Sequence, residues 1–182
     1  MRKTVRYAVA QGLVAGLALA LSACGGDPEP RFEEEPSPTP SKVTSSAPAK
    51  EAWEEKSPEG AMAFAEHWVA ELNAASLSGD TAGLQSVSAT DCSSCASLIK
   101  FIDETYAGGG EIRGGDWRLT KLNFSSPDEG QTVAVGGTMK IPAQTVVTPE
   151  GQRQESAALE ADYFFTMSWR QGWQVDVVET RG

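Results

Sequence analysis

The sequence predicts an α+β domain over residues 57–182, in which N-terminal helices pack against a curved antiparallel sheet. Over residues 58–107 apolar side chains recur every three or four positions, which is the spacing of amphipathic helices. After Gly115 apolar residues alternate with polar ones, as they do in strands that bury one face. Helices that come first and strands that follow are typical of this fold class.

Residues 1–23 have the composition of a secretory signal peptide. Three basic residues among the first six precede the apolar run 12–21, which is shorter than the roughly 20 residues that a transmembrane helix needs. The next residues, Leu-Ser-Ala-Cys at 21–24, resemble the lipobox of bacterial lipoproteins. This resemblance implies that Cys24 carries acyl chains such as palmitate and that the membrane is a partner through this lipid. The localisation that follows is the cell membrane, lipid-anchored, on its extracytoplasmic face. An ordinary secretory signal followed by a chance cysteine is the alternative.

Residues 24–56 comprise the lipidated Cys24 and a tether rich in Pro, Ser, Thr and Glu. Such a composition buries too little apolar surface to offset the entropy of ordering, so we expect a disordered linker. Its prolines favour extended polyproline II, which would hold the domain away from the bilayer. The PSPTPS sequence at 36–41 is also a candidate for O-glycosylation or for a proline-binding groove, but a spacer is the simpler interpretation.

Three helices are expected at the start of the domain. The first begins at the cap Ser57, followed by a proline and an acidic residue, and it ends at Gly79. Asp80 begins a short second helix, and Asp91 or a following serine begins a third that ends in the glycines 108–110. One apolar stripe on the first helix comprises Ala61, Phe64, Ala65, Trp68, Leu72 and Ala75.

The remaining chain is predicted to form an antiparallel meander. Turn signals at 127–130 and 149–151 separate its alternating runs. We expect Val177 to point inward with Val175. Loss of alternation near Lys121 predicts a bulge or bend, and Pro142 is expected at an edge or bulge because it cannot donate a ladder hydrogen bond. The runs are 117–124, 133–141, 159–169 and 173–177.

Several segments together resemble an uncharacterised family of actinobacterial lipoproteins that have a lipobox, a Pro-rich linker and an NTF2-like domain. The segments are EGAMAFAEHWVAELNAASLSGDTAGL at 59–84, DCSSC at 91–95, GGDW at 114–117 and PAQTVV at 142–147. The resemblance implies the NTF2-like cone of ketosteroid-isomerase-like proteins, in which a bent sheet wraps around a long helix. It implies no particular activity.

Cys92 and Cys95 form an even pair if Cys24 is acylated, and outside the cytoplasm we expect them to form a disulfide. Redox exchange is the alternative, because a Cys-x-x-Cys at a helix start can have a lowered thiol pKa. No metal is expected, since two cysteines and one histidine do not complete a structural zinc site.

The NTF2-like resemblance implies a cone interior that can hold a small apolar ligand. Its candidate pocket residues are the tyrosines Tyr106 and Tyr163 with the tryptophans Trp68, Trp117 and Trp169, although side chains at these spacings usually form core. We identify no catalytic residue. His67 faces the edge of the solvent side of its helix, and Ser97-x-x-Lys100 is a chance match to a penicillin-recognising motif.

The chain carries 25 acidic against 15 basic residues, a net charge of −10, which argues against nucleic acid as a partner. We therefore expect a membrane-anchored lipoprotein whose domain is a non-catalytic ligand- or protein-binding module of the cell envelope, with no cofactor. Its partner would be an envelope protein or a small apolar ligand, and the oligomeric state is left open. The alternative is an isomerase- or dehydratase-like pocket enzyme.

Overall fold

The computed structural model describes residues 50–126 and 132–181. The predicted signal peptide 1–23, the predicted lipid attachment at Cys24, most of the tether and the predicted turn at 127–130 lie outside the described residues. No helix in the described ranges is long and apolar enough to cross a membrane.

Four helical elements begin the described chain: η1 (Ala52–Glu54), α1 (Pro58–Ser78), α2 (Ala82–Ser86) and α3 (Ser93–Ala107). Ser57 caps α1 as predicted, because its hydroxyl accepts a hydrogen bond from Gly60 N at 3.0 Å. Gly79 ends α1 with φ 77°, and a Cβ there would lie 2.5 Å from the Tyr106 ring. The α3 cap is Cys92 rather than Asp91.

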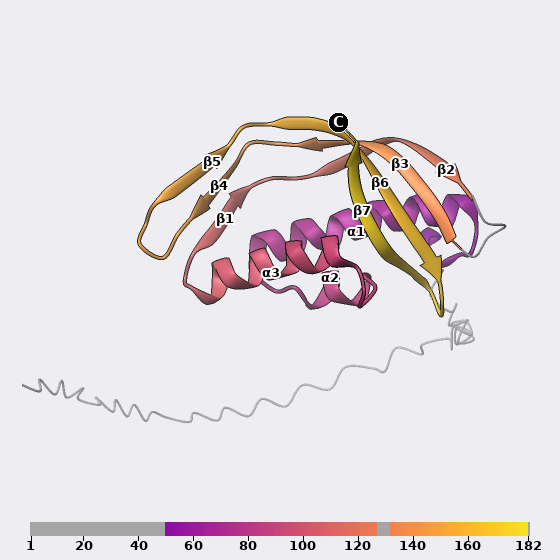
Figure 1. The fold of residues 1–182 in the computed structure, drawn as a ribbon, viewed down its shortest axis with the longest axis horizontal. Coiled ribbons are helices and arrows are strands. Elements are labelled where there is room, and N and C mark those ends of the chain that lie inside the picture. Colours follow the sequence, from indigo (N-terminus) through magenta and orange to yellow (C-terminus); the bar gives the residue numbers. More distant parts are fainter. Residues whose placement is uncertain (1–49, 127–131, 182) are drawn as a thin grey trace, which may run out of the picture. The chain divides into compact units, whose positions relative to one another are not determined.

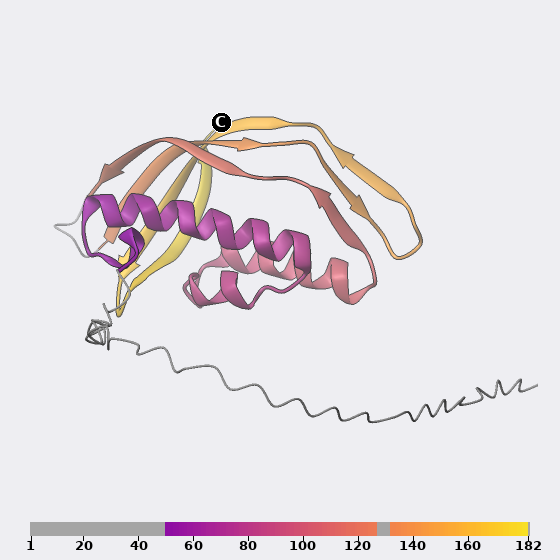
Figure 2. The same cartoon turned by 180° about the vertical axis from the view of Figure 1, so that it is seen from behind.

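The strands form two antiparallel sheets. A four-stranded sheet has the order β2-β3-β6-β7, and a three-stranded sheet has the order β1-β4-β5. Together they arch over the helices, with the long helix α1 beneath the arch (Figures 1 and 2). The bounds are β1 (Glu111–Gly114), β2 (Arg118–Ser125), β3 (Thr132–Ile141), β4 (Gln144–Val147), β5 (Arg153–Ser156), β6 (Leu159–Trp169) and β7 (Trp173–Arg181).

The bend between the two sheets lies where the chain leaves one sheet for the other. Gly114 and Gly115 both have positive φ between β1 and β2, a conformation that favours glycine. Pro142 was expected at an edge or bulge; it instead follows Ile141, the last residue of β3, in the link to β4, where no ladder hydrogen bond is required of it. The three-stranded sheet itself was not predicted, because its sequences EIRG, QTVV and RQES alternate poorly.

Two bulges interrupt the four-stranded sheet. Lys121 has φ 54° and the register of β2 against β3 shifts between Thr120 and Asn123, which confirms the predicted irregularity. A second shift between β6 and β7 was not foreseen. It places Val177 at 37% exposure, so the expectation that Val177 points inward with Val175 was wrong.

The core lies between α1 and the concave face of the four-stranded sheet. Trp68 of α1 meets Phe165 of β6 edge to face, with ring centroids 5.6 Å apart, and both side chains are buried. The indole Nε1–H of Trp68 donates to Ser88 Oγ at 2.9 Å, so this buried donor is satisfied. All six residues of the predicted α1 stripe are buried in the core, to which Leu84 of α2 and Ile102 of α3 also contribute.

Residues 50–56, here called the strap, pack on the domain instead of continuing the tether to residue 56 as expected. Trp53 stacks on His67 with ring centroids 4.2 Å apart and an interplanar angle of 2°. Trp173 Nε1–H donates to the carbonyl of Glu55 at 2.8 Å. Trp53 supplies the apolar surface that holds the strap on the domain. The prediction for residues 24–56 rested on their average composition, in which a single tryptophan has little weight.

Candidate functional site

A cavity of about 210 Å³, here called the arch cavity, lies among residues of α1, α3 and the three-stranded sheet. Its apolar wall comes from all three parts of the fold. Ser76, Gln144 and Ser156 contribute its polar groups. The apolar lining residues are Leu72, Leu98, Phe101, Ile102, Ile112, Trp117 and Val146.

The lining decides what chemistry the arch cavity can perform. None of the described residues that line it is ionisable. General acid–base catalysis needs a titratable group within hydrogen-bond reach of the reacting atoms. The arch cavity can therefore hold a ligand, but its lining offers no side chain for proton transfer.

Trp117 is the most specific feature of the arch cavity. Asn73 of α1 holds its backbone on both sides: Asn73 Nδ2 donates to Trp117 O at 2.9 Å, and Trp117 N donates to Asn73 Oδ1 at 3.0 Å. The indole Nε1 is buried and finds no hydrogen-bond partner among the described residues. Sequence analysis did not identify Asn73, although it is an amide residue beside the apolar stripe of a helix.

The five predicted pocket residues are not brought together. Trp117 lines the arch cavity, and Tyr163 packs edge to face against it at 6.3 Å. Burial raises the pKa of the Tyr163 phenol above its usual value. Trp68 belongs to the core, and Trp169 lies in a different groove beside Trp173. The sequence grouped the five residues as possible pocket walls, but periodicity could not tell which part of the interior each one reaches.

Tyr106 has a structural role. Its hydroxyl donates to the carbonyl of Ser76 at 2.7 Å and accepts from Ile112 N at 3.3 Å. It therefore links α3 to the end of α1 and to β1, which form part of the arch-cavity wall. Both hydrogen-bonding functions of this phenol are in use, so it is not a free proton donor.

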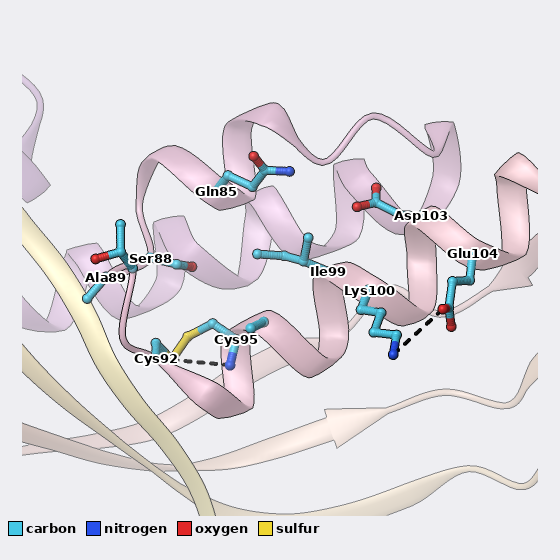
Figure 3. A pocket seen from close by; sticks show the side chains of 11 residues that line it. Gln85, Ser88, Ala89, Cys92, Cys95, Ile99, Lys100, Asp103 and Glu104 are labelled. Carbon is cyan, nitrogen blue, oxygen red and sulfur yellow. Dashed lines mark hydrogen bonds and ion pairs between the residues drawn. A yellow bond between two sulfur atoms is a disulfide. The ribbon is translucent and has the colours of Figure 1, made fainter.

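A second pocket, of about 380 Å³, runs along α3 (Figure 3). Five of its polar side chains have partners within the fold, those of Gln85, Ser88, Lys100, Asp103 and Glu104. Asp103 accepts from the Thr81 hydroxyl at 2.8 Å, and Lys100 pairs with Glu104 at 3.7 Å. Ser88 Oγ accepts a hydrogen bond from the Trp68 indole N–H.

The Ser97-x-x-Lys100 sequence does not form a catalytic pair. Ser97 Oγ donates to the carbonyl of Ser93 at 2.9 Å, and Lys100 pairs with Glu104. Among the described residues, no three His, Cys, Asp or Glu side chains are grouped so that they could hold a metal ion. His67 is half-buried on α1, which fits the expected position at the edge of the solvent side, and Trp53 stacks on its ring.

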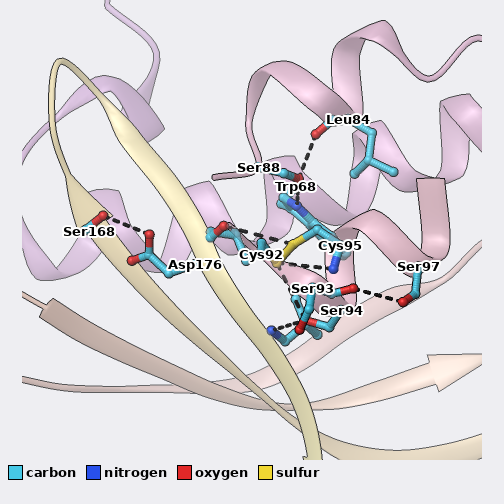
Figure 4. Close-up of a disulfide and its surroundings, with 12 residues drawn as sticks. Trp68, Leu84, Ser88, Cys92, Ser93, Ser94, Cys95, Ser97, Ser168 and Asp176 are labelled. Atoms are coloured by element: carbon cyan, nitrogen blue, oxygen red, sulfur yellow. Dashed lines mark hydrogen bonds between the residues drawn. A yellow bond between two sulfur atoms is a disulfide. The ribbon is translucent and has the colours of Figure 1, made fainter. Parts of the chain in front are cut away.

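Cys92 and Cys95 form a disulfide at the start of α3 (Figure 4). Both residues are 1% exposed. Cys92 Sγ also accepts a hydrogen bond from Cys95 N at 3.1 Å, so it caps the helix. Because exchange requires a thiolate to reach a sulfur atom, this burial favours a structural bridge over redox exchange.

Comparison with known families and structures identifies relatives at the level of the fold. The model of a family of unknown function, DUF6318, matches residues 46–178. The intermembrane-space region of the chloroplast protein ARC6 superposes with a TM-score of 0.52 at 16% identity, covering 68% of this chain and 95% of that chain. No curated protein matches the sequence.

Two bacterial structures are also similar. An NTF2-like protein with a cystatin-like fold from Novosphingobium aromaticivorans has 15% identity and a TM-score of 0.40, covering 65% of this chain and 79% of that chain. A protein of unknown function from Mycobacterium tuberculosis has 14% identity and a TM-score of 0.45, covering 66% and 75%. At these identities the likeness concerns the fold alone. The predicted α+β class, in which N-terminal helices pack against antiparallel sheets, is confirmed.

Proposed function

The chain belongs to DUF6318, a family of unknown function, and we propose that its NTF2-like domain is a non-catalytic ligand-binding module of the cell envelope. The observation that carries this proposal is the arch cavity, a largely apolar space whose described lining residues are uncharged. We propose further that lipid on Cys24 holds the module at the extracytoplasmic face of the cell membrane. The lipobox-like sequence at 21–24 supports this anchoring.

The cavity restricts the ligand class. Its volume of about 210 Å³ is somewhat larger than the roughly 150 Å³ cavity that holds benzene in an engineered protein. A small, largely apolar molecule would fill the space, and Ser76, Gln144 and Ser156 are the polar residues that line it. The alternative, an isomerase- or dehydratase-like enzyme, would need an ionisable group that the lining does not supply.

Native mass spectrometry of the full chain, purified from its host envelope, tests this proposal. We expect a bound small molecule, and we expect its occupancy to fall when Val146→Trp fills the arch cavity. Leu159→Trp adds similar bulk at a side chain that is 55% exposed and outside the cavity, so it should retain the molecule. An empty wild-type protein, or equal occupancy in the two variants, would contradict ligand binding in this cavity.

A further inference from the structure

A groove of about 490 Å³, here called the strap–hairpin groove, lies between the strap, α1 and the hairpin that joins β6 to β7. Three of the five tryptophans of the chain line it. Trp53 comes from the strap, and Trp169 and Trp173 flank the hairpin turn. Segments more than 100 residues apart are thus brought to one groove, as the hydrogen bond between Trp173 and Glu55 shows.

The tryptophans differ in how much of their surface the fold uses. Trp173 is 6% exposed and donates its indole N–H to the Glu55 carbonyl, so it forms the floor of the groove. Trp53 and Trp169 are only half-buried. Trp53 packs one face on His67, and Trp169 meets Trp173 at 84° with centroids 5.1 Å apart. The groove therefore retains accessible indole surface on two of its sides.

Polar groups surround this aromatic surface. Lys50, Glu54 and Gln171 all line the groove and are exposed. Glu54 uses one carboxylate oxygen to accept from Glu51 N at 3.2 Å, and its other oxygen has no such contact. Among these polar groups, the positive charge of Lys50 and the negative charge of Glu54 balance each other. The groove consequently gives no preference to a strongly anionic or cationic ligand.

We propose that the strap–hairpin groove binds a neutral oligosaccharide. Sugar rings present flat C–H faces that pack on indole rings and rims of hydroxyl groups that bond to carboxylate, amide and ammonium groups, and the groove offers both surfaces side by side. The groove holds the sugar without cleaving it. Canonical glycoside hydrolysis needs two carboxyl groups flanking the bond, whereas Glu54 is the single carboxylate among the described lining residues.

This site is separate from the arch cavity, since the two share no lining residue. The oligosaccharide proposal therefore goes beyond the proposed function and does not depend on it. It also assigns the strap a purpose, because the strap supplies three of the groove's side chains, those of Lys50, Trp53 and Glu54.

The test measures binding of chitotetraose and cellotetraose to the full chain by isothermal titration calorimetry and saturation-transfer NMR. The detergent must lack a sugar head group, because a glycoside detergent would compete. We expect binding, and we expect Trp169→Ala to lower the affinity about threefold to tenfold, the loss typical of one aromatic contact. Trp169→Phe should restore most of the affinity, since it keeps an aromatic face.

Val146→Trp serves as the control, because it fills the arch cavity and should leave saccharide affinity unchanged. Several outcomes would overturn the proposal. The first is the absence of saturation transfer to either sugar at about 10 mM, a concentration well above the Kd of a millimolar complex. The second is a Trp169→Ala variant that binds the sugars as tightly as the wild type. The third is a loss of sugar binding in Val146→Trp but not in Trp169→Ala. If a synthetic peptide of residues 27–43 binds in a Trp169-dependent way and neither sugar does, the occupant is a proline-rich peptide and the saccharide proposal is wrong.

Discussion

Ser94 illustrates how single side chains connect the helical layer to the sheet. Its hydroxyl accepts the backbone N–H of Val178 at 2.9 Å, close to the bulge where the β6–β7 register shifts. Cys92 and Cys95 flank Ser94 and fix the start of α3. The Cys-Ser-Ser-Cys segment thus joins α3 to β7, because Ser94, the second of its two serines, bonds to the β7 backbone.

Removing the disulfide should destabilise the domain without unfolding it. For Cys92→Ala with Cys95→Ala we expect the free energy of unfolding to fall by about 2 kcal/mol, since the bridge closes a loop of only four residues. Urea denaturation measures this change. Ser97→Ala, on the exposed side of the same helix, should have little effect. A double variant as stable as the wild type would show that the bridge is dispensable.

The strap is the element for which the expectation from sequence and the structure differ most. Its composition predicts a continuation of the disordered tether, yet Trp53 stacks on His67 and Trp173 donates to the strap backbone. By contrast, Lys121 was correctly placed at an irregularity, because a break in alternation is visible within one strand. Trp53 shows no such local sign, since its ring partners, Phe64 and His67, lie on α1.

Two truncated chains test the strap. A chain that begins at residue 50 should unfold at higher urea than one that begins at residue 57, with a difference of about 2 kcal/mol from one aromatic stack and one hydrogen bond. The second chain also leaves the Trp173 N–H without its partner. Trp53→Ala in the longer chain should reproduce about half of the loss. Equal stability of the two chains would show that the strap packs without contributing stability.

At the scale of the whole molecule, the charge and polarity of the outer surface decide whether the protein could dock directly on a membrane. The face of the four-stranded sheet opposite α1 carries exposed polar pairs, such as Thr138 with Asp162 and Lys140 with Glu160. The chain as a whole carries a net charge of −10. Neither feature favours docking on an anionic bilayer, which recruits basic surfaces. Attachment to the membrane through lipid on Cys24 therefore stays a prediction that the charge of the domain does not replace.

Cys24→Ala tests that prediction in cells. We expect the wild-type protein in the membrane fraction and the variant in the soluble or secreted fraction, because the variant lacks the acylation site. Cys92→Ala with Cys95→Ala is the matched control, since it removes two cysteines but keeps Cys24. Retention of the Cys24 variant in the membrane fraction would contradict lipid anchoring through this residue.

The sequence by itself determined the α+β class, the order of the three helices and of the four strands of the larger sheet, the caps at Ser57 and Gly79 and the bulge at Lys121. These features depend on periodicity and on residues a few positions apart, so they are visible locally. Only the tertiary structure decided which inward aromatic residue meets which cavity. Trp117 reaches the arch cavity, Trp68 the core and Trp169 the strap–hairpin groove, because each position depends on neighbours far along the chain and on the bend of the sheet.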